Sequence, residues 1–180
     1  MKYYQALTEA IGLMMGAFAD RVRTGPRHEP AYTHSLSVAM ALVKYECDVE
    51  TVVAGVLHDT KEDTEVSLDD IEGKFGPVVR MIVDACSYDE KIGDNQMGED
   101  DILRRVIQLA QEGETRPLLI KVVDSGDNLK TCRHLKPEFQ ERMVFCGTRW
   151  LEQGKKYLPG HLAVEDLSIV LERERKRLGM

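Results

Sequence analysis

The sequence predicts an all-α fold, a single compact bundle of about eight to ten helices. Apolar residues recur at spacings of three and four, as in amphipathic helices, and no segment alternates convincingly as a strand does. The chain has 180 residues, of which 43% are hydrophobic and 31% charged. This composition is typical of a soluble globular protein, and the length suits one domain over residues 1–180 with a substantial core.

A stripe of apolar side chains predicts an amphipathic helix at the start of the chain. Its members lie three or four residues apart and are Leu7, Ile11, Met14, Phe18 and Val22. Segment 24–30 contains a glycine and two prolines and therefore predicts a loop. A second helix is expected over roughly 32–45, with Leu36, Met40 and Val43 on one apolar face.

Capping residues mark the starts of the next helices. Asp48 can cap a helix over 49–59, whose apolar density predicts burial on most sides. The run Ser67-Leu68-Asp69-Asp70 resembles a capping box with Asp in place of Glu, and it opens a short helix. Pro77 suits the first turn of the following helix, which we expect over 77–87.

The second half of the chain is also predicted to be helical. Residues 88–98 contain two glycines and predict a surface loop, and Gly113 is a suitable helix stop. The charged run 172–177 predicts a solvated helix face with local ion pairs. The expected helices cover residues 99–112, 117–131, 137–153 and 163–178.

Charge and composition exclude several classes of function. The net charge of −7 disfavours binding to a nucleic-acid backbone, although a few local Arg and Lys residues suffice for a small phosphorylated ligand. No apolar run reaches membrane-spanning length and no secretion signal is recognisable, so we expect a cytoplasmic protein. The four cysteines form no CxxC motif and are expected in or near the core. The sequence leaves open whether the protein forms a homo-oligomer, because an apolar helix face can pack in the core or at an interface between subunits.

Two histidines and two aspartates are candidate ligands of one metal ion. His58 and Asp59 end one very apolar stretch, and Asp124 ends another. Charge buried at such places is costly unless it is paired or bound to a metal. With His34, these residues form a mixed nitrogen and oxygen set, which suits Mn²⁺, Fe²⁺ or Zn²⁺ better than Ca²⁺. Taken singly, each also has an ordinary explanation, such as a partly buried polar residue on a helix.

Two further carboxylates are candidates for catalysis, and one amide is a candidate for substrate binding. Glu62 and Asp63 could act as general acid or base on the attacking water, and their alternative role is as solvated loop carboxylates. Asn128 lies four residues after Asp124, so both face the same way on a helix, and it could orient water or hold a substrate oxygen. Asp127 receives no role from the sequence.

Three segments resemble the motifs of a known family. Residues 29–39 resemble an "EPYxxHxxxVA" start with one residue shifted, and residues 121–131 resemble "KLADRLxNxRT". Residues 57–64 match "LHDTxEDT" almost throughout, and this match is the more specific. Together they resemble the HD superfamily of metal-dependent phosphohydrolases, and most closely the hydrolase domain of RelA/SpoT enzymes and their small stand-alone relatives. The resemblance spans roughly residues 5–155.

The resemblance implies a complete active site. It implies one divalent metal ion, usually manganese, held by His34, His58, Asp59 and Asp124. It also implies Glu62 and Asp63 as catalytic carboxylates beside the attacking water. The implied substrate-binding residues are Asn128, Arg23 with Arg21 and Arg27 as rivals, and Arg105 with Arg104 as its rival.

The resemblance predicts removal of pyrophosphate from (p)ppGpp at the 3′ position. Where the family has a basic residue, this chain has Ser125, and Asp127 adds a negative charge nearby. These departures slightly favour a second hypothesis, a phosphatase of deoxynucleoside monophosphates or NADPH. A third hypothesis, a catalytically idle nucleotide-binding protein on the same scaffold, is disfavoured by the complete ligand set.

Overall fold

The computed structural model describes residues 3–23, 29–88 and 95–180, and within them it confirms the predicted all-α class. A short antiparallel bridge joins Val22 to Pro30. None of the described helices is both long and apolar enough to cross a membrane. In chain order the helices are α1 (Tyr3–Ala17), α2 (Tyr32–Lys44), α3 (Val49–Leu57), α4 (Thr60–Asp63), α5 (Leu68–Phe75), α6 (Pro77–Cys86), α7 (Asn95–Gln111), α8 (Arg116–Thr131), the 3₁₀ turn η1 (Cys132–His134), α9 (Pro137–Tyr157) and α10 (Leu162–Leu178).

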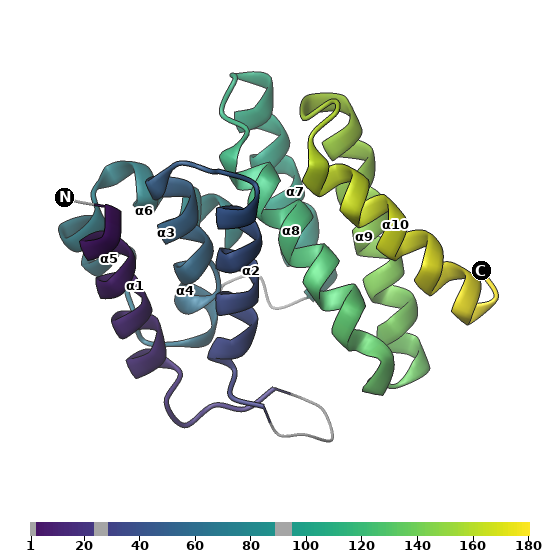
Figure 1. Ribbon diagram of the computed structural model, residues 1–180, viewed down its shortest axis with the longest axis horizontal. Coiled ribbons are helices and arrows are strands. Elements are labelled where there is room, and N and C mark those ends of the chain that lie inside the picture. Colours follow the sequence, from purple (N-terminus) through teal and green to yellow (C-terminus); the bar gives the residue numbers. More distant parts are fainter. Residues whose placement is uncertain (1–2, 24–28, 89–94) are drawn as a thin grey trace.

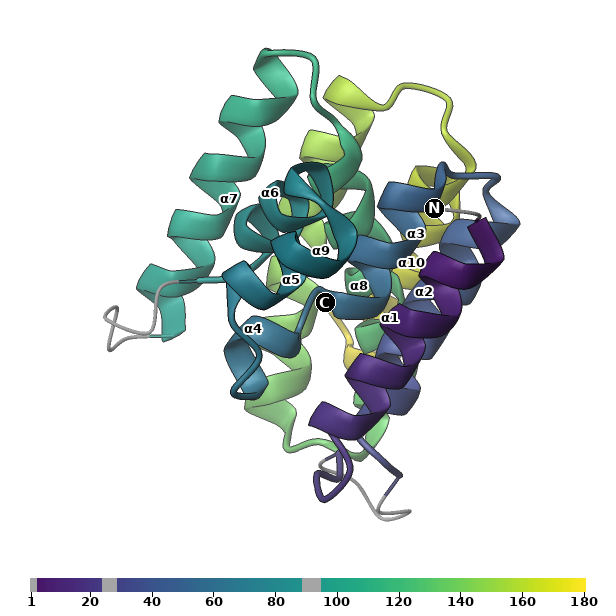
Figure 2. The same cartoon turned by 90° about the vertical axis from the view of Figure 1, so that its left-hand side faces the viewer.

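Helix α8 lies at the centre of the bundle. It packs against α2 and α3 on one side and against α9 and α10 on the other (Figure 1). Helices α5 and α6 form a pair beside α3, and α7 runs along the edge next to α6 and α8 (Figure 2). Side chains of α3 and α8 are buried over most of their length, so these two helices lie in the core, to which the other long helices contribute one face each. The segments around His34 and around His58 therefore pack against α8, which carries Asp124.

Local capping signals in the sequence are confirmed. The Asp48 carboxylate accepts a hydrogen bond from the backbone N–H of Thr51 at 2.7 Å and starts α3. Ser67 and Asp70 form the reciprocal capping box that starts α5. Pro77 occupies the first turn of α6. Each signal depends on atoms only a few residues apart, which is why the sequence alone predicts it.

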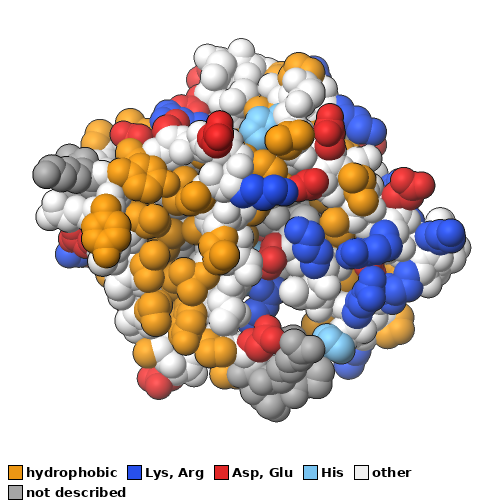
Figure 3. All heavy atoms as spheres, viewed as in Figure 1, with side chains coloured by type: hydrophobic (Ala, Val, Ile, Leu, Met, Phe, Trp, Pro, Cys, Tyr) orange, Lys and Arg blue, Asp and Glu red, His pale blue; other side chains and the backbone are white. Residues whose placement is uncertain are grey.

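The predicted apolar faces of the first two helices are partly wrong. Helix α1 ends at Ala17, and Val22 lies beyond it in the bridge with 60% of its surface exposed. On α2 the buried residues are His34, Ser35, Val38, Ala39 and Leu42, whereas Met40 and Val43 are exposed. Both faces of this helix carry apolar side chains, so periodicity did not identify the face that packs on α3. Figure 3 shows apolar side chains gathered on the surface where α1 and α2 lie.

The second half of the chain differs from prediction in helix bounds and in one charge. Helix α7 starts at Asn95, inside the predicted loop, and residues 89–94 lie outside the described part of the chain. Helix α9 continues to Tyr157. The Glu174 side chain, predicted on a solvated face, is fully buried. It accepts hydrogen bonds from Arg133, Arg173 and Arg177, and the first of these lies 41 residues away.

Candidate metal centre

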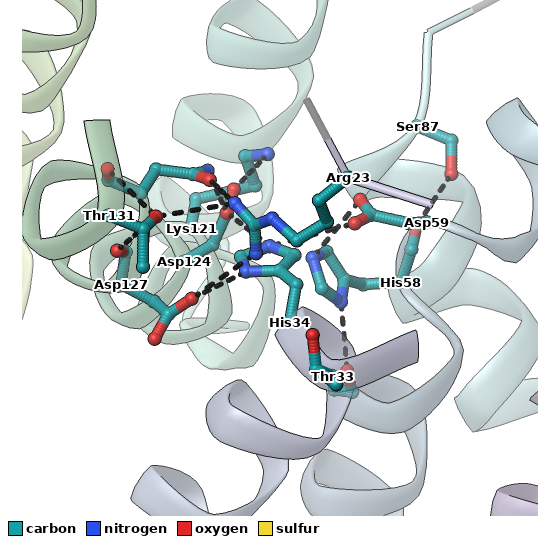
Figure 4. Close-up of polar contacts among 12 residues, drawn as sticks. Arg23, Thr33, His34, His58, Asp59, Ser87, Lys121, Asp124, Asp127 and Thr131 are labelled. Atoms are coloured by element: carbon teal, nitrogen blue, oxygen red, sulfur yellow. Dashed lines mark hydrogen bonds and ion pairs between the residues drawn. The ribbon is translucent and has the colours of Figure 1, made fainter. Parts of the chain in front are cut away.

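Four candidate ligands come together from helices α2 and α8 and from the turn between α3 and α4. His34 lies in the first turn of α2, His58 ends α3, and Asp59 follows it directly. Asp124 lies in the middle of α8, opposite both histidines (Figure 4). The donor atoms of His34, His58 and Asp59 all lie within 4.8 Å of one another.

His58 presents a bare nitrogen to the cluster. Its ring is 1% exposed, and its Nδ1 lies 2.8 Å from the backbone oxygen of Gly55. A carbonyl oxygen only accepts, so Nδ1 carries a proton, and in the neutral tautomer the lone pair is on Nε2. Nε2 is buried and has no hydrogen-bond partner in the described part of the chain, although an oxygen of Asp59 lies 3.1 Å away. A buried acceptor without a donor requires an explanation, and a bound cation supplies one.

His34 faces carboxylates on both sides of its ring. Its Nε2 lies 3.0 Å from Asp124 Oδ1 and 3.6 Å from Asp59 Oδ2, while its Nδ1 lies 2.7 Å from Asp127 Oδ2. Burial alone lowers the pKa of His34, but the hydrogen bonds to Asp124 and Asp127 outweigh burial and raise the pKa to about 10. A proton therefore holds this ring between the carboxylates when no cation is bound. Metal binding would displace that proton from the ligand nitrogen.

Asp124 is held by neighbours on its own helix. Lys121 donates to its Oδ2 at 2.7 Å, and Asn128 donates to its Oδ1 at 2.6 Å. Burial alone would raise the pKa of Asp124, but Lys121 and His34 hold it well below its usual range. Asp124 is therefore a carboxylate at neutral pH, as a metal ligand must be.

The two candidate catalytic carboxylates sit on the short helix α4, next to Asp59. Burial raises the pKa of Glu62 to about 7, with Lys121 opposing the shift and Asp59 adding to it. Burial and then Asp59 also raise the pKa of Asp63. Glu62 accepts a hydrogen bond from the backbone N–H of Tyr88 at 2.9 Å, which fixes its orientation. A carboxyl with a pKa near 7 is suited to general acid or base work at neutral pH.

A cavity of about 370 Å³ opens beside the ligands. Its polar lining includes His34, Asp59, Asp63, Lys121, Asp124 and Asn128, and its apolar lining includes Phe18, Met143 and Trp150. Arg23 lies at its wall and donates a hydrogen bond to Asn128 Oδ1 at 3.1 Å. Ser125 also lines it. A mixed polar and apolar hollow of this kind suits a small ligand.

None of the other candidate arginines in the described part of the chain lines this cavity. Arg105 donates to Asp101 and to the backbone oxygens of Asp84 and Ser87, so it closes the end of α6. As a substrate ligand it would have to give up these bonds. Arg104 pairs with Asp101 on the exposed side of α7. Arg21 lines a different hollow, and Arg27 lies outside the described residues.

Two residues of the site carried no assigned role in the sequence. Lys121 precedes Asp124 by three residues, and this spacing could have indicated the pair. Asp127 also lies three residues from Asp124, but its partner His34 is 93 residues away in the chain. Local spacing carries no information about such a contact.

Donor set and fold agree on one class of protein. The cluster offers imidazole nitrogens and carboxylate oxygens, and one buried nitrogen accepts no hydrogen bond from any described residue. This fits a divalent transition metal ion with room for water and substrate. Fold and site together define a helical domain built around a divalent cation.

The comparison with family models gives the same result. Residues 13–145 match the model of the HD domain. The chain belongs to the HD domain family, whose members hold a divalent metal.

Individual relatives confirm the resemblance to RelA/SpoT proteins. A GTP pyrophosphokinase of Streptomyces antibioticus is 37% identical over 127 residues, which are 69% of this chain and 15% of that protein. The bifunctional (p)ppGpp synthase/hydrolase SpoT of Escherichia coli K12 is 33% identical over 128 residues, or 70% of this chain and 18% of that protein. The chain thus spans less than a fifth of these relatives.

A solved structure matches over nearly the whole length. It is described as a metazoan ortholog of SpoT that hydrolyzes ppGpp, and it aligns with a TM-score of 0.76 at 24% identity. The match covers 97% of this chain and 96% of that one. At this identity the likeness establishes the fold.

Proposed function

We propose that this protein is a divalent-metal-dependent phosphohydrolase that removes the 3′-pyrophosphate from (p)ppGpp. The observation that carries the proposal is the buried Nε2 of His58, which faces His34 and Asp59 and has no hydrogen-bond partner among the described residues, with Glu62 three residues after Asp59. The Escherichia coli relative at 33% identity, which is named a (p)ppGpp synthase/hydrolase, supports the choice of substrate.

The proposed metal is Mn²⁺, held by His34, His58, Asp59 and Asp124. A set of two imidazoles and two carboxylates suits Mn²⁺ and Fe²⁺, and it also accommodates Zn²⁺. The bound ion would supply Lewis acidity, lowering the pKa of water and polarising a phosphoryl oxygen. Metal analysis of protein purified without added metal, followed by activity with each ion, identifies the native one.

In the proposed reaction Glu62 takes a proton from the attacking water. Its raised pKa and its fixed contact with Tyr88 suit it to this role, and Asp63, which lines the cavity, orients the same water. The water oxygen forms a bond to the phosphorus next to the ribose, and the bond from that phosphorus to the 3′ oxygen breaks. The 3′ oxygen takes up a proton, and pyrophosphate leaves.

Cationic groups at the cavity would hold the phosphates. Lys121 and Arg23 both line it, and the amide of Asn128 accepts a hydrogen bond from Arg23 and donates one to Asp124. Positive charge near the developing negative charge lowers the barrier to phosphoryl transfer. The apolar lining of Phe18, Met143 and Trp150 would face the less polar part of the nucleotide.

The test is incubation of the purified protein with Mn²⁺ and ppGpp, with release of pyrophosphate as the readout. The proposal expects pyrophosphate and GDP in equal amounts. Intact Mn²⁺ binding without pyrophosphate would defeat the choice of substrate. The Glu62→Gln variant is the control, because it should bind Mn²⁺ and release nothing.

A second candidate function rests on the departures from the family motif. Ser125 lines the cavity without a charge, and Asp127 pairs with Arg23 at 3.6 Å, which takes up part of the cationic charge. A less cationic cavity suits a smaller phosphate, as in a deoxynucleoside monophosphate or NADPH. A screen that measures phosphate and pyrophosphate separately distinguishes the two, because only the alarmone yields pyrophosphate.

A further inference from the structure

Asp127 connects two parts of the site that come from distant segments. It lies on α8 one turn after Asp124, and its side chain is 17% exposed. Its Oδ2 atom lies 2.7 Å from Nδ1 of His34 and 3.6 Å from a guanidinium nitrogen of Arg23 (Figure 4). A carboxylate that contacts both a candidate ligand and a cavity arginine is placed to organise the site.

A histidine binds a metal through only one ring nitrogen, and the other nitrogen decides which one. The ring nitrogen that carries the proton needs a fixed acceptor, and the opposite nitrogen is then bare. Asp127 offers such an acceptor to Nδ1 of His34, which leaves Nε2 toward Asp124 and Asp59.

His58 is held in the same way by a different acceptor. Its Nδ1 donates to the backbone oxygen of Gly55, and its Nε2 faces the cluster. The two imidazoles thus share one arrangement, in which Nδ1 is anchored outward and Nε2 points inward. A backbone carbonyl provides the anchor for one ring, and for the other it is a side chain that mutation can remove.

We propose that Asp127 is a positioning residue of the metal centre, which anchors Nδ1–H of His34 so that Nε2 is the ligand nitrogen. The inference rests on the metal-binding part of the proposed function and is independent of the substrate. It also accounts for the negative charge of Asp127, because this carboxylate contacts His34 and Arg23 and does not face an open cavity.

Three variants test this role. Asp127→Ala removes the acceptor, and Asp127→Asn keeps the size and one acceptor oxygen but loses the charge. Asp166→Asn is the matched control, because its carboxylate accepts a hydrogen bond from Tyr45 and pairs with Lys44, away from His34. Loss of an outer carboxylate typically weakens metal binding about 10–100-fold.

The first readout is Mn²⁺ affinity by calorimetry without any nucleotide. We expect Asp127→Ala to lose roughly 100-fold and Asp127→Asn roughly 10-fold, while Asp166→Asn stays within about twofold of the parent protein. Unchanged affinity in both Asp127 variants overturns the proposal. If Asp127→Ala does not fold, the isosteric Asp127→Asn decides.

The second readout reports on the ring itself. In the Zn²⁺-loaded protein, ¹⁵N spectra of the imidazoles distinguish a protonated Nδ1 from a protonated Nε2. The parent protein should show His34 with its proton on Nδ1, and Asp127→Ala should lose this signature while that of His58 persists. A His34 spectrum that is the same in both proteins contradicts the inference. Because neither readout involves turnover, a parent protein that binds Mn²⁺ but cleaves no ppGpp would defeat the substrate and leave this proposal standing.

Discussion

Two buried groups of charges in this molecule are built in opposite ways. Around Glu174, one carboxylate accepts a hydrogen bond from each of three guanidinium groups, those of Arg133, Arg173 and Arg177. Around His34 and His58, two imidazoles face several carboxylates, and one ring nitrogen has no hydrogen-bond partner among the residues that the structure describes. A structural cluster completes its hydrogen bonds, whereas a binding site keeps donor atoms ready for a ligand.

The largest expected effect separates the two groups by activity. Glu62→Gln should lower turnover at least 100-fold, because an amide cannot take a proton from water. Glu174→Gln should leave turnover within about twofold, since its carboxylate lies at the other cluster. The measurement is steady-state hydrolysis at saturating Mn²⁺. Comparable losses in both variants would remove the distinction.

Metal should stabilise one cluster and leave the other unaffected. At Mn²⁺ concentrations about 100 times the dissociation constant, binding adds about 2.7 kcal/mol, which for a protein of this size raises the melting temperature by roughly 5–10 °C. His58→Ala should abolish the shift, and Glu174→Gln should keep it. A full shift in His58→Ala would show that the ion binds elsewhere.

Truncation of the arginine cluster should affect folding alone. Glu174→Ala removes one acceptor from three guanidinium groups. Arg177 keeps its bond to Gln140, and because Arg133 and Arg173 are about half exposed they can be hydrated again. We therefore expect a loss of about 2 kcal/mol in the free energy of unfolding, below the range for a fully buried pair. Urea denaturation measures it. An unchanged midpoint would mean that these bonds contribute nothing.

The same contrast predicts different responses to pH. Burial raises the pKa of Glu62 to about 7, and as a base this group works only when ionised, so kcat/KM should fall about tenfold per pH unit below that value. The charge of a bound ion will lower the midpoint. Profiles of kcat/KM against pH test this, and activity that rises on acidification would contradict the role as base.

At the arginine cluster the pKa of the carboxyl group shifts in the opposite direction. Burial alone would raise the pKa of Glu174, but its three arginines outweigh burial and lower the pKa to about 2. Its contribution to stability is therefore complete above the ordinary value of 4.5 and is lost only as the pH falls toward 2. Between pH 5 and 8 the free energy of unfolding of Glu174→Ala, measured by urea denaturation, should lie below that of the parent protein by a constant amount.

The sequence predicted those features that depend on near neighbours. The caps at Asp48 and Ser67 were predicted correctly because donor and acceptor lie three residues apart. The buried face of α2 was predicted wrongly, because apolar side chains on both faces satisfy the same periodicity. The salt bridge from Arg133 to Glu174 was missed because nothing local indicates a partner 41 residues away.

The candidate site follows the same rule. His58 and Asp59 are adjacent and follow an apolar helix, and Asn128 is one turn from Asp124, so short patterns indicated them. The contact between His34 and Asp127 joins α2 to α8 across 93 residues. It became visible only when the packing of these two helices was known.

The central claim is that His34, His58, Asp59 and Asp124 share one cation. A crystal structure of the protein soaked in Mn²⁺, with anomalous data at the manganese edge, tests it directly. We predict one strong peak within bonding distance of both Nε2 atoms and of both carboxylates. An absent peak, or a peak bound by other side chains while these four point apart, would contradict it.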